Sequence, residues 1–324
     1  MNQNKLVVPR IVVLDSQTLG MNLSSLAGLG ELVEYPLTAP DETVERIRGA
    51  DIVLTNKVRI SAAEMEGAPN LGMIGLFATG YNNIDVDAAR QRGIAVCNVA
   101  GYSTDSVVQH VFGLLLSLAG GICRHGRAVR EGEWADSATF SFWKKPTVEI
   151  AGKTMGIVGF GNIGSGVARV ANAFGMKVIA YAPRPKPEPD FSPFRFVGLD
   201  ELFSESDFIS LNCPLTPENF GMINRARLSQ MKRSAYLINC SRGGLVNEAD
   251  LRAALDEGLI AGAGLDVTVE EPMPRSSPLF GAPNCLITPH IAWATVEARE
   301  RLLEEVVRNI KSFLAGKPCN VVNL

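Results

Sequence analysis

Short runs of β-branched and other apolar residues alternate along the whole chain with segments of helical periodicity, and this alternation restricts the fold most. The runs lie at 11–15, 51–56, 71–78 and 95–99 in the first part, and at 155–160, 177–182, 207–213, 235–240, 263–267 and 285–289 in the second. Apolar runs joined by helices are typical of parallel strands with crossover connections. We therefore predict an α/β fold with two Rossmann-like, doubly wound parallel sheets.

Two further segments suggest how the chain is divided. Residues 103–150 begin with a helical pattern that is apolar almost all round, as in a helix buried between domains or subunits. After the last strand, residues 296–313 form an amphipathic helical pattern that could return to the first part. We predict a discontinuous, flavodoxin-like outer domain over 1–102 plus 296–324, and an inserted domain over 103–295.

Composition excludes several classes of protein. The chain has 31 Lys and Arg against 34 Asp and Glu, a net charge of -3, so we expect neither nucleic acid nor an anionic membrane as a partner. The apolar run 111–122 falls short of the roughly 20 residues of a bilayer span, and no secretory signal is evident, so we expect a cytoplasmic protein. Six cysteines without a CxxC pair and three histidines predict no metal site.

The sequence GFGNIG at 159–164 directly follows one predicted strand and directly precedes a helical pattern. In that setting Gly159 permits a tight turn, Gly161 lets a pyrophosphate approach the backbone, and Gly164 lets the helix pack closely on the strand. The helix amino terminus then faces the anion. The motif predicts a dinucleotide site, and a glycine-rich turn without a ligand is the alternative.

The end of the next strand bears on which dinucleotide is bound. NAD sites usually carry an acid at that position for the ribose 2′-hydroxyl, whereas this strand ends in Ala182 and is followed by Arg184 and Lys186. A guanidinium there could hold a 2′-phosphate. We predict NADP(H) in preference to NAD(H), with NAD(H) still possible. The alternative is that both cations are solvated charges in the proline-rich loop 182–190.

Three polar residues follow the ends of three predicted strands: Arg242, Glu271 and His290. Ligands of parallel sheets gather at this edge, so the three together indicate a site, although each alone is more often structural or solvated. An imidazole exchanges a proton with a carbonyl or alcohol, a carboxylate orients the ring, and a guanidinium binds a substrate carboxylate. We predict these roles for His290, Glu271 and Arg242.

Other polar residues are less informative from the sequence. His110 lies in the apolar helix and is expected to pack there, and His125 lies among arginines on a solvated face. The segment Ala78-Thr79-Gly80 follows another strand, and successive amides in such a turn can bind an anion. An ordinary Asn/Gly turn explains that segment equally well.

The chain resembles the D-isomer-specific 2-hydroxyacid dehydrogenases along essentially its whole length. The motifs that carry the resemblance are ATGYNNID at 78–85, NVAGYSTDSVVQH at 98–110, GFGNIG at 159–164, CPLTPEN at 213–219, NCSRGG at 239–244, LDVTVEEP at 265–272 and TPHIAWAT at 288–295. The resemblance implies the same three roles for Arg242, Glu271 and His290. It also implies a dimer with 103–150 as the interface.

The resemblance further implies which residues surround the ligands. The substrate carboxylate would be bound by amides around Ala78, Thr79 and Gly80, with Trp293, and potentially Trp143, shaping the pocket. The residues implied as dinucleotide contacts, besides those of the glycine motif and Arg184, are Thr104, Asn162, Ile163, Cys213, Pro214, Asn219, Cys240, Ser241 and Asp266. Asp266 would bind the nicotinamide amide.

Within this family the chain resembles the glycerate dehydrogenase and glyoxylate/hydroxypyruvate reductase branch. The expected activity is therefore NAD(P)H-dependent reduction of hydroxypyruvate or glyoxylate to the D-2-hydroxy acid. Two alternatives remain open: a reductase of bulkier 2-oxo acids, and a dinucleotide-sensing protein similar to the transcriptional co-repressors that share this fold.

Overall fold

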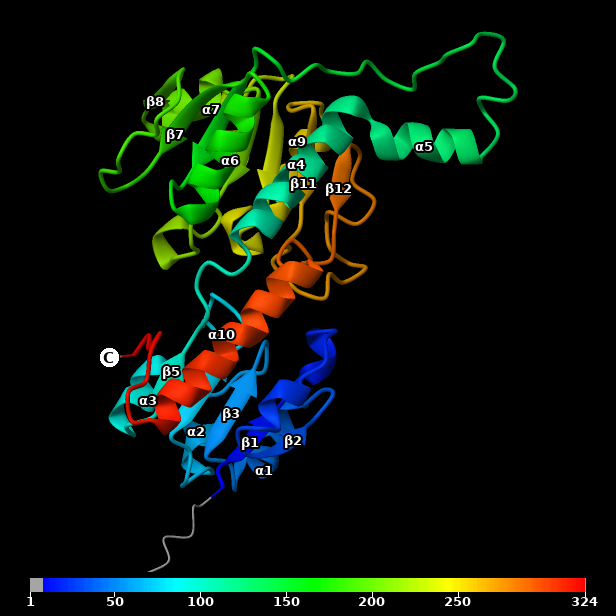
Figure 1. Cartoon of the computed structure of the whole chain (residues 1–324). Helices are drawn as coiled ribbons and strands as arrows, with labels where there is room; N and C mark the ends of the chain where they lie inside the picture. The colour runs from blue at the N-terminus through cyan, green and yellow to red at the C-terminus, as the bar shows by residue number, and fades with distance from the viewer. Residues whose placement is uncertain (1–7, 324) are drawn as a thin grey trace, which may run out of the picture. The chain divides into compact units, whose positions relative to one another are not determined.

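A computed structural model describes residues 8–323 of the chain, which form two compact units (Figure 1). One unit is made of the described parts of residues 1–103 and 294–324, and the other is Thr104–Trp293. Residues 1–7, which begin the segment considered above for a secretory signal, lie outside the described residues.

The discontinuous unit is built on a five-stranded sheet in the order β2-β1-β3-β4-β5, with every pair parallel. This is the flavodoxin-like order. Its strands are β1 (Arg10–Val13), β2 (Glu31–Glu34), β3 (Ile52–Thr55), β4 (Met73–Leu76) and β5 (Ala95–Cys97). Its helices are α1 (Thr43–Ile47), α2 (Ala62–Glu66), α3 (Val86–Gln91) and α10 (Val296–Leu314). The C-terminal helix α10 packs on β4, so the chain does return to its first sheet.

The second unit holds a seven-stranded parallel sheet in the order β12-β11-β10-β9-β6-β7-β8. Its strands are β6 (Thr154–Val158), β7 (Lys177–Tyr181), β8 (Phe194–Phe196), β9 (Phe208–Leu211), β10 (Tyr236–Asn239), β11 (Gly262–Leu265) and β12 (Cys285–Ile287). Its helices are α4 (Thr104–Gly120), α5 (Ile122–Arg130), α6 (Asn162–Ala173), α7 (Leu199–Glu205), α8 (Arg225–Gln230) and α9 (Glu248–Asp256). Strand order reverses at β6, as in Rossmann folds.

Both faces of this second sheet are covered, because the central strands are buried throughout and two apolar clusters flank them. Parallel strands with two buried faces are expected to be continuous apolar runs, as they are here. The predicted α/β fold with two parallel sheets is confirmed. The predictions missed β2 and β8, which are edge strands without a buried apolar run.

Helix α4 supplies much of one apolar cluster, with Val111, Leu115 and neighbouring residues buried. Figure 1 shows α5 and the segment after it reaching away from the sheet of their unit. Phe140 and Trp143, in that segment, are 91% and 70% exposed. Within residues 8–323 no single helix is long and apolar enough to cross a membrane; α4 and α5 meet that criterion only as a pair bent by 63°.

Candidate active site

The register of the second sheet aligns the carboxyl ends of five strands. Val158 of β6 pairs with Leu211 of β9, which pairs with Asn239 of β10. Asn239 pairs with Leu265 of β11, and Leu265 pairs with Ile287 of β12. Each polar residue predicted in this unit to act at a strand end therefore leaves the same edge of one sheet. This edge is where open parallel sheets bind ligands.

The glycine turn has the shape that a pyrophosphate needs. Gly159 has φ +94°, which L-residues rarely adopt, and a side chain there would lie 2.7 Å from the carbonyl oxygen of Asn212. At Gly164 an added Cβ would lie 2.1 Å from the carbonyl oxygen of Gly159, so the helix can approach only because this residue is glycine. A Cβ at Gly161 would meet nothing within 4 Å. This open face, at the amino terminus of α6, fits a dinucleotide phosphate.

Thr104 and Arg184, both predicted as dinucleotide contacts, lie on elements next to that turn. Thr104 begins α4 beside α6, since a Cβ on Gly166 would lie 3.9 Å from its Cγ2. After β7, Ala182 packs against the apolar cluster and Arg184 is exposed in a segment without regular structure. No carboxylate takes the place of Ala182 at the end of β7, and the exposed guanidinium is chemically suited to a 2′-phosphate.

Residues that follow β9 and β10 are connected by hydrogen bonds. The Ser241 hydroxyl donates to the carbonyl of Cys213 at 2.5 Å, and the amide of Asn219 donates to the carbonyl of Pro214 at 2.8 Å. Burial raises the pKa of the Cys240 thiol, and the Asp266 charge raises it further. Burial also raises the pKa of Cys213. Both thiols are therefore protonated at neutral pH and act as packing groups rather than nucleophiles.

His290 and Glu271 form a direct pair. The distance from Nδ1 of His290 to Oε2 of Glu271 is 2.6 Å, and their side chains are 25% and 35% exposed. The other carboxylate oxygen of Glu271 accepts the backbone N–H of Thr268 at 3.2 Å. The carboxylate thus fixes the ring through Nδ1, which leaves Nε2 to exchange a proton with a bound substrate.

Arg242 follows β10 beside this pair. The residue after it, Gly243, packs so closely that a Cβ there would lie 2.0 Å from the carbonyl of Thr268, whose own N–H binds Glu271. The Arg242 carbonyl accepts the side-chain amide of Asn239 at 2.9 Å, and its guanidinium donates to the carbonyl of Ser241 at 2.8 Å. One Nη therefore binds the protein backbone, and the planar group retains further donors for an anion.

The chain is similar in sequence to known proteins. The model of the D-isomer specific 2-hydroxyacid dehydrogenase family, NAD binding domain, matches residues 112–292. Over 320 residues the chain is 44% identical to a hydroxypyruvate reductase of Blautia hydrogenotrophica, covering 97% of this chain and 99% of the relative. It is 41% identical over 316 residues to a glycerate dehydrogenase of Methylorubrum extorquens, with 97% and 98% covered. The chain belongs to the D-isomer-specific 2-hydroxyacid dehydrogenases.

Solved structures agree with this assignment. The NADPH-dependent glyoxylate/hydroxypyruvate reductase of Sinorhizobium meliloti, solved with NADP and malonate, superposes with a TM-score of 0.85 at 29% identity, covering 97% of this dehydrogenase and 96% of that chain. The family resemblance stated from the motifs is confirmed, and so is a nicotinamide dinucleotide as the cofactor.

The predicted substrate-binding residues of this dehydrogenase fall in different units. Ala78, Thr79 and Gly80 follow β4 in the discontinuous unit, where the Thr79 hydroxyl donates to the carbonyl of Val99 at 2.7 Å. Trp293 lies in the other unit, and its indole N–H donates to the carbonyl of His290 at 2.9 Å. The structure therefore brings Trp293 to His290 and holds the 78–80 turn in a defined conformation within its own unit.

The structure shows contacts of three polar residues of the dehydrogenase that the sequence did not predict. Asp266 accepts hydrogen bonds from Thr288 and from two backbone amides, and His110 lies 2.9 Å from Thr288 rather than only packing in α4. Ser106 donates to the carbonyl of Ala292 at 2.5 Å. A signal for the α4 residues was available, since Ser106 and His110 are polar residues four apart on a mostly apolar helix.

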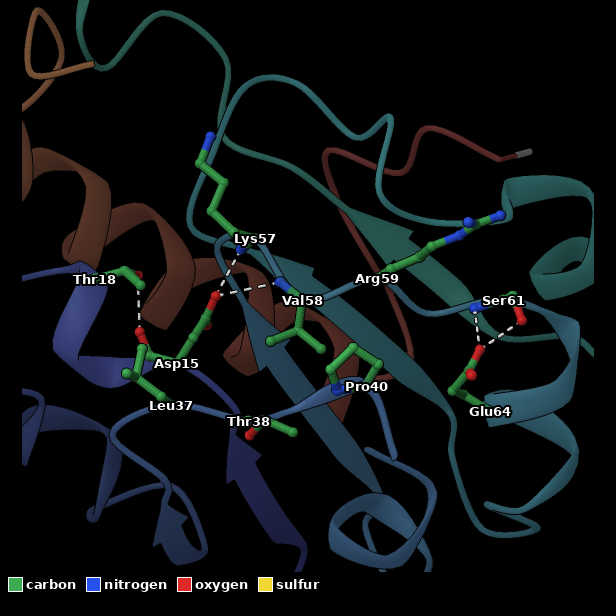
Figure 2. Close-up of a pocket in the computed structure, with 10 residues that line it drawn as sticks. All are labelled: Asp15, Thr18, Leu37, Thr38, Pro40, Lys57, Val58, Arg59, Ser61 and Glu64. Atoms are coloured by element: carbon green, nitrogen blue, oxygen red, sulfur yellow. Dashed lines mark hydrogen bonds between the residues drawn. The ribbon is translucent and has the colours of Figure 1, made fainter. Parts of the chain in front are cut away.

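A separate cavity of about 780 Å³ lies in the discontinuous unit at the carboxyl ends of β1 and β3 (Figure 2). The residues predicted for the active site do not line it. Asp15, at its base, accepts the backbone N–H groups of Asn56 at 2.9 Å and Lys57 at 2.6 Å. Among residues 8–323, no group of three or more His, Cys, Asp or Glu is placed to hold a metal ion.

Proposed function

We propose that this dehydrogenase reduces a small 2-oxo acid, hydroxypyruvate or glyoxylate, to the D-2-hydroxy acid with NADPH. The observation that carries the proposal is the His290–Glu271 pair at 2.6 Å, on the same sheet edge as the open glycine turn. The hydroxypyruvate reductase and glycerate dehydrogenase among the relatives support this substrate class. The exposed Arg184 after β7 supports the choice of NADPH over NADH.

The protein's own residues would act as follows. Arg242 binds the 2-oxo acid through its guanidinium, and the amides of Ala78, Thr79 and Gly80 receive the carboxylate. A bound nicotinamide supplies the hydride that is added to C2. His290 donates the proton to the carbonyl oxygen as it becomes a hydroxyl, and Glu271 stabilises the imidazolium before transfer and holds the ring. The neutral imidazole then regains a proton from water. The hydride added to C2 and the proton added to oxygen together complete the two-electron reduction.

The roles of the dinucleotide contacts are part of the same proposal. Gly159, Gly161, Asn162, Ile163 and Gly164 would hold the pyrophosphate at the start of α6. The remaining contacts would be Thr104, Arg184, Cys213, Pro214, Asn219, Cys240, Ser241 and Asp266. The Asp266 carboxylate accepts three hydrogen bonds within the protein, and Asp266 is 1% exposed. Its contact with the nicotinamide amide stays a prediction.

The decisive experiment follows the absorbance of reduced nicotinamide with hydroxypyruvate, glyoxylate, pyruvate and phenylpyruvate, each with NADPH and with NADH. We expect the two small acids hydroxypyruvate and glyoxylate to be reduced fastest, with a kcat/KM for NADPH at least about tenfold above that for NADH, as one charge-assisted contact provides. Faster reduction of phenylpyruvate would indicate the bulkier class. Equal use of NADH would contradict the role of Arg184, and silence with every acid would favour a dinucleotide-sensing protein.

We further propose a cytoplasmic homodimer, with residues 103–150 as the interface. The exposed aromatic residues Trp134, Phe140 and Trp143 support this interface, since large apolar side chains gathered on one segment mark association surfaces. Six unpaired cysteines suit a reducing compartment. Size-exclusion chromatography with light scattering should give twice the 34.8 kDa of the chain, and a monomeric mass would contradict the proposal.

A further inference from the structure

The backbone of His290 is strained. Its φ is +54°, in the left-handed region that non-glycine residues seldom adopt. Such a conformation costs free energy and persists only where surrounding contacts hold it. The turn that presents the imidazole must therefore be fixed by specific bonds.

Asp266 provides most of those bonds. Its carbonyl accepts the N–H of His290 at 2.8 Å, and its carboxylate accepts the N–H groups of Ile291 at 3.0 Å and Ala292 at 2.7 Å. Three consecutive amides of the turn are thus bound to one residue at the end of β11. A shift of the Asp266 side chain would release the strained turn.

Thr288 and His110 in turn hold Asp266. The Thr288 hydroxyl donates its one hydrogen to Oδ1 of Asp266 at 2.6 Å. Oγ1 of Thr288 also lies 2.9 Å from Nε2 of His110. Because the hydroxyl hydrogen is already used, Nε2 must be the donor in this second hydrogen bond. Nε2 also lies 3.4 Å from Oδ1 of Asp266. His110 therefore carries a proton on Nε2 and donates it toward Thr288 Oγ1 and the Asp266 carboxylate.

The charge on Asp266 depends on these donors. Burial raises the pKa of its carboxyl, but the hydrogen bonds from His110, Thr288 and the two backbone amides lower the pKa more, and the net pKa lies below its ordinary value. The carboxylate is thus ionised at neutral pH although Asp266 is 1% exposed. A buried carboxylate that loses a donor is destabilised unless it moves to find another.

A second contact comes from the same face of α4. Ser106 lies one turn before His110, and its hydroxyl donates to the carbonyl of Ala292 at 2.5 Å. Ser106 is 3% exposed, so no solvent replaces this bond if it is lost. These two polar residues of α4 therefore both contact the turn, His110 through Thr288 and Asp266, and Ser106 directly.

We propose that His110 and Ser106 are positioning residues, which hold the strained turn so that the imidazole of His290 stays aligned with Glu271 and the substrate. Neither residue touches the reacting atoms in this account. The inference rests on the proposed role of His290 as the acid/base. It adds that proton transfer at His290 depends on two side chains of α4.

The test compares His110→Phe, which keeps a ring without a donor, with His110→Gln, whose amide can donate in place of Nε2. We expect His110→Phe to lower kcat about tenfold, because a misplacement of the order of 1 Å weakens catalysis substantially. The dissociation constant for NADPH, measured by fluorescence titration, should stay within about twofold, and His110→Gln should regain at least half of the kcat. Parental activity in His110→Phe would overturn the proposal, as would equal losses in both variants or a loss confined to NADPH binding.

Ser106→Ala removes a single oxygen and is the second test. We expect a kcat loss of about threefold to tenfold with unchanged NADPH affinity, as for one lost buried hydrogen bond. If His110→Phe does not fold, this variant decides by the same criteria, and parental kcat would overturn the proposal. Failure of the proposed function would be seen differently, as full turnover in His290→Ala or silence of the parental protein with every 2-oxo acid.

Discussion

Replacement of His290 by alanine is expected to lower kcat for hydroxypyruvate by about 10³-fold or more. A positioned acid/base contributes on the order of 10² to 10⁴ to the rate, and His290 is the imidazole that pairs with Glu271 at the carboxyl edge of the sheet. The dinucleotide contacts proposed here involve other residues, so the NADPH dissociation constant should change by no more than about twofold. Stopped-flow turnover and fluorescence titration measure the two quantities.

His125→Ala is the matched control for that experiment. His125 lies in α5, and its Nε2 accepts the backbone N–H of Lys144 at 3.1 Å, with no link to the strand ends. We expect parental kcat in this variant. Turnover of His290→Ala at the level of His125→Ala would refute the assignment of the acid/base.

Replacement of Arg242 by alanine should cause the second large loss, expressed mainly in kcat/KM for the 2-oxo acid. Truncation of one member of a desolvated ion pair costs about 2 to 5 kcal/mol, which corresponds to a loss of about 30-fold to several thousand-fold. Arg242→Lys keeps the charge but not the planar fork of donors, so it should regain only part of the loss. Steady-state kinetics over a range of hydroxypyruvate concentrations gives the result.

The control for Arg242 is Arg233→Ala, which removes an exposed guanidinium that donates to the carbonyl of Gly258 at 3.4 Å. We expect its kcat/KM to remain within about twofold of the parental value, as for surface charges in general. The same kcat/KM in Arg242→Ala and Arg233→Ala would show that Arg242 does not bind the substrate.

The central strands could be predicted from the sequence because they are buried on both faces and consist of apolar runs, as in β9 and β10. The edge strands β2 and β8 could not, since ELVE and FRF mix exposed charges with half-buried residues. Such segments become strands only because they form backbone hydrogen bonds with a neighbouring strand. That information is tertiary and is not contained in a local pattern.

In the candidate site, too, some features could be predicted from the sequence and others could not. Arg242, Glu271 and His290 could be predicted as candidates from position, because the carboxyl ends of parallel strands must meet at one edge. The roles of Ser106 and His110 depend on how α4 crosses the sheet, which their own sequence does not determine. The positive φ of His290 was equally unpredictable, since it is maintained by tertiary bonds of the turn, most of them to Asp266.

Asp15 has a consequence for the discontinuous unit as a whole. Strand order in the five-stranded sheet reverses at β1, the topological position where sheets of this kind receive anionic ligands, and the amides of Asn56 and Lys57 point to that position. Those amides already donate to the Asp15 carboxylate, so a side chain of the protein occupies the place of an anionic ligand there. The sheet of the discontinuous unit thus satisfies these amides from within, whereas the glycine turn of the second unit leaves the face at Gly161 open.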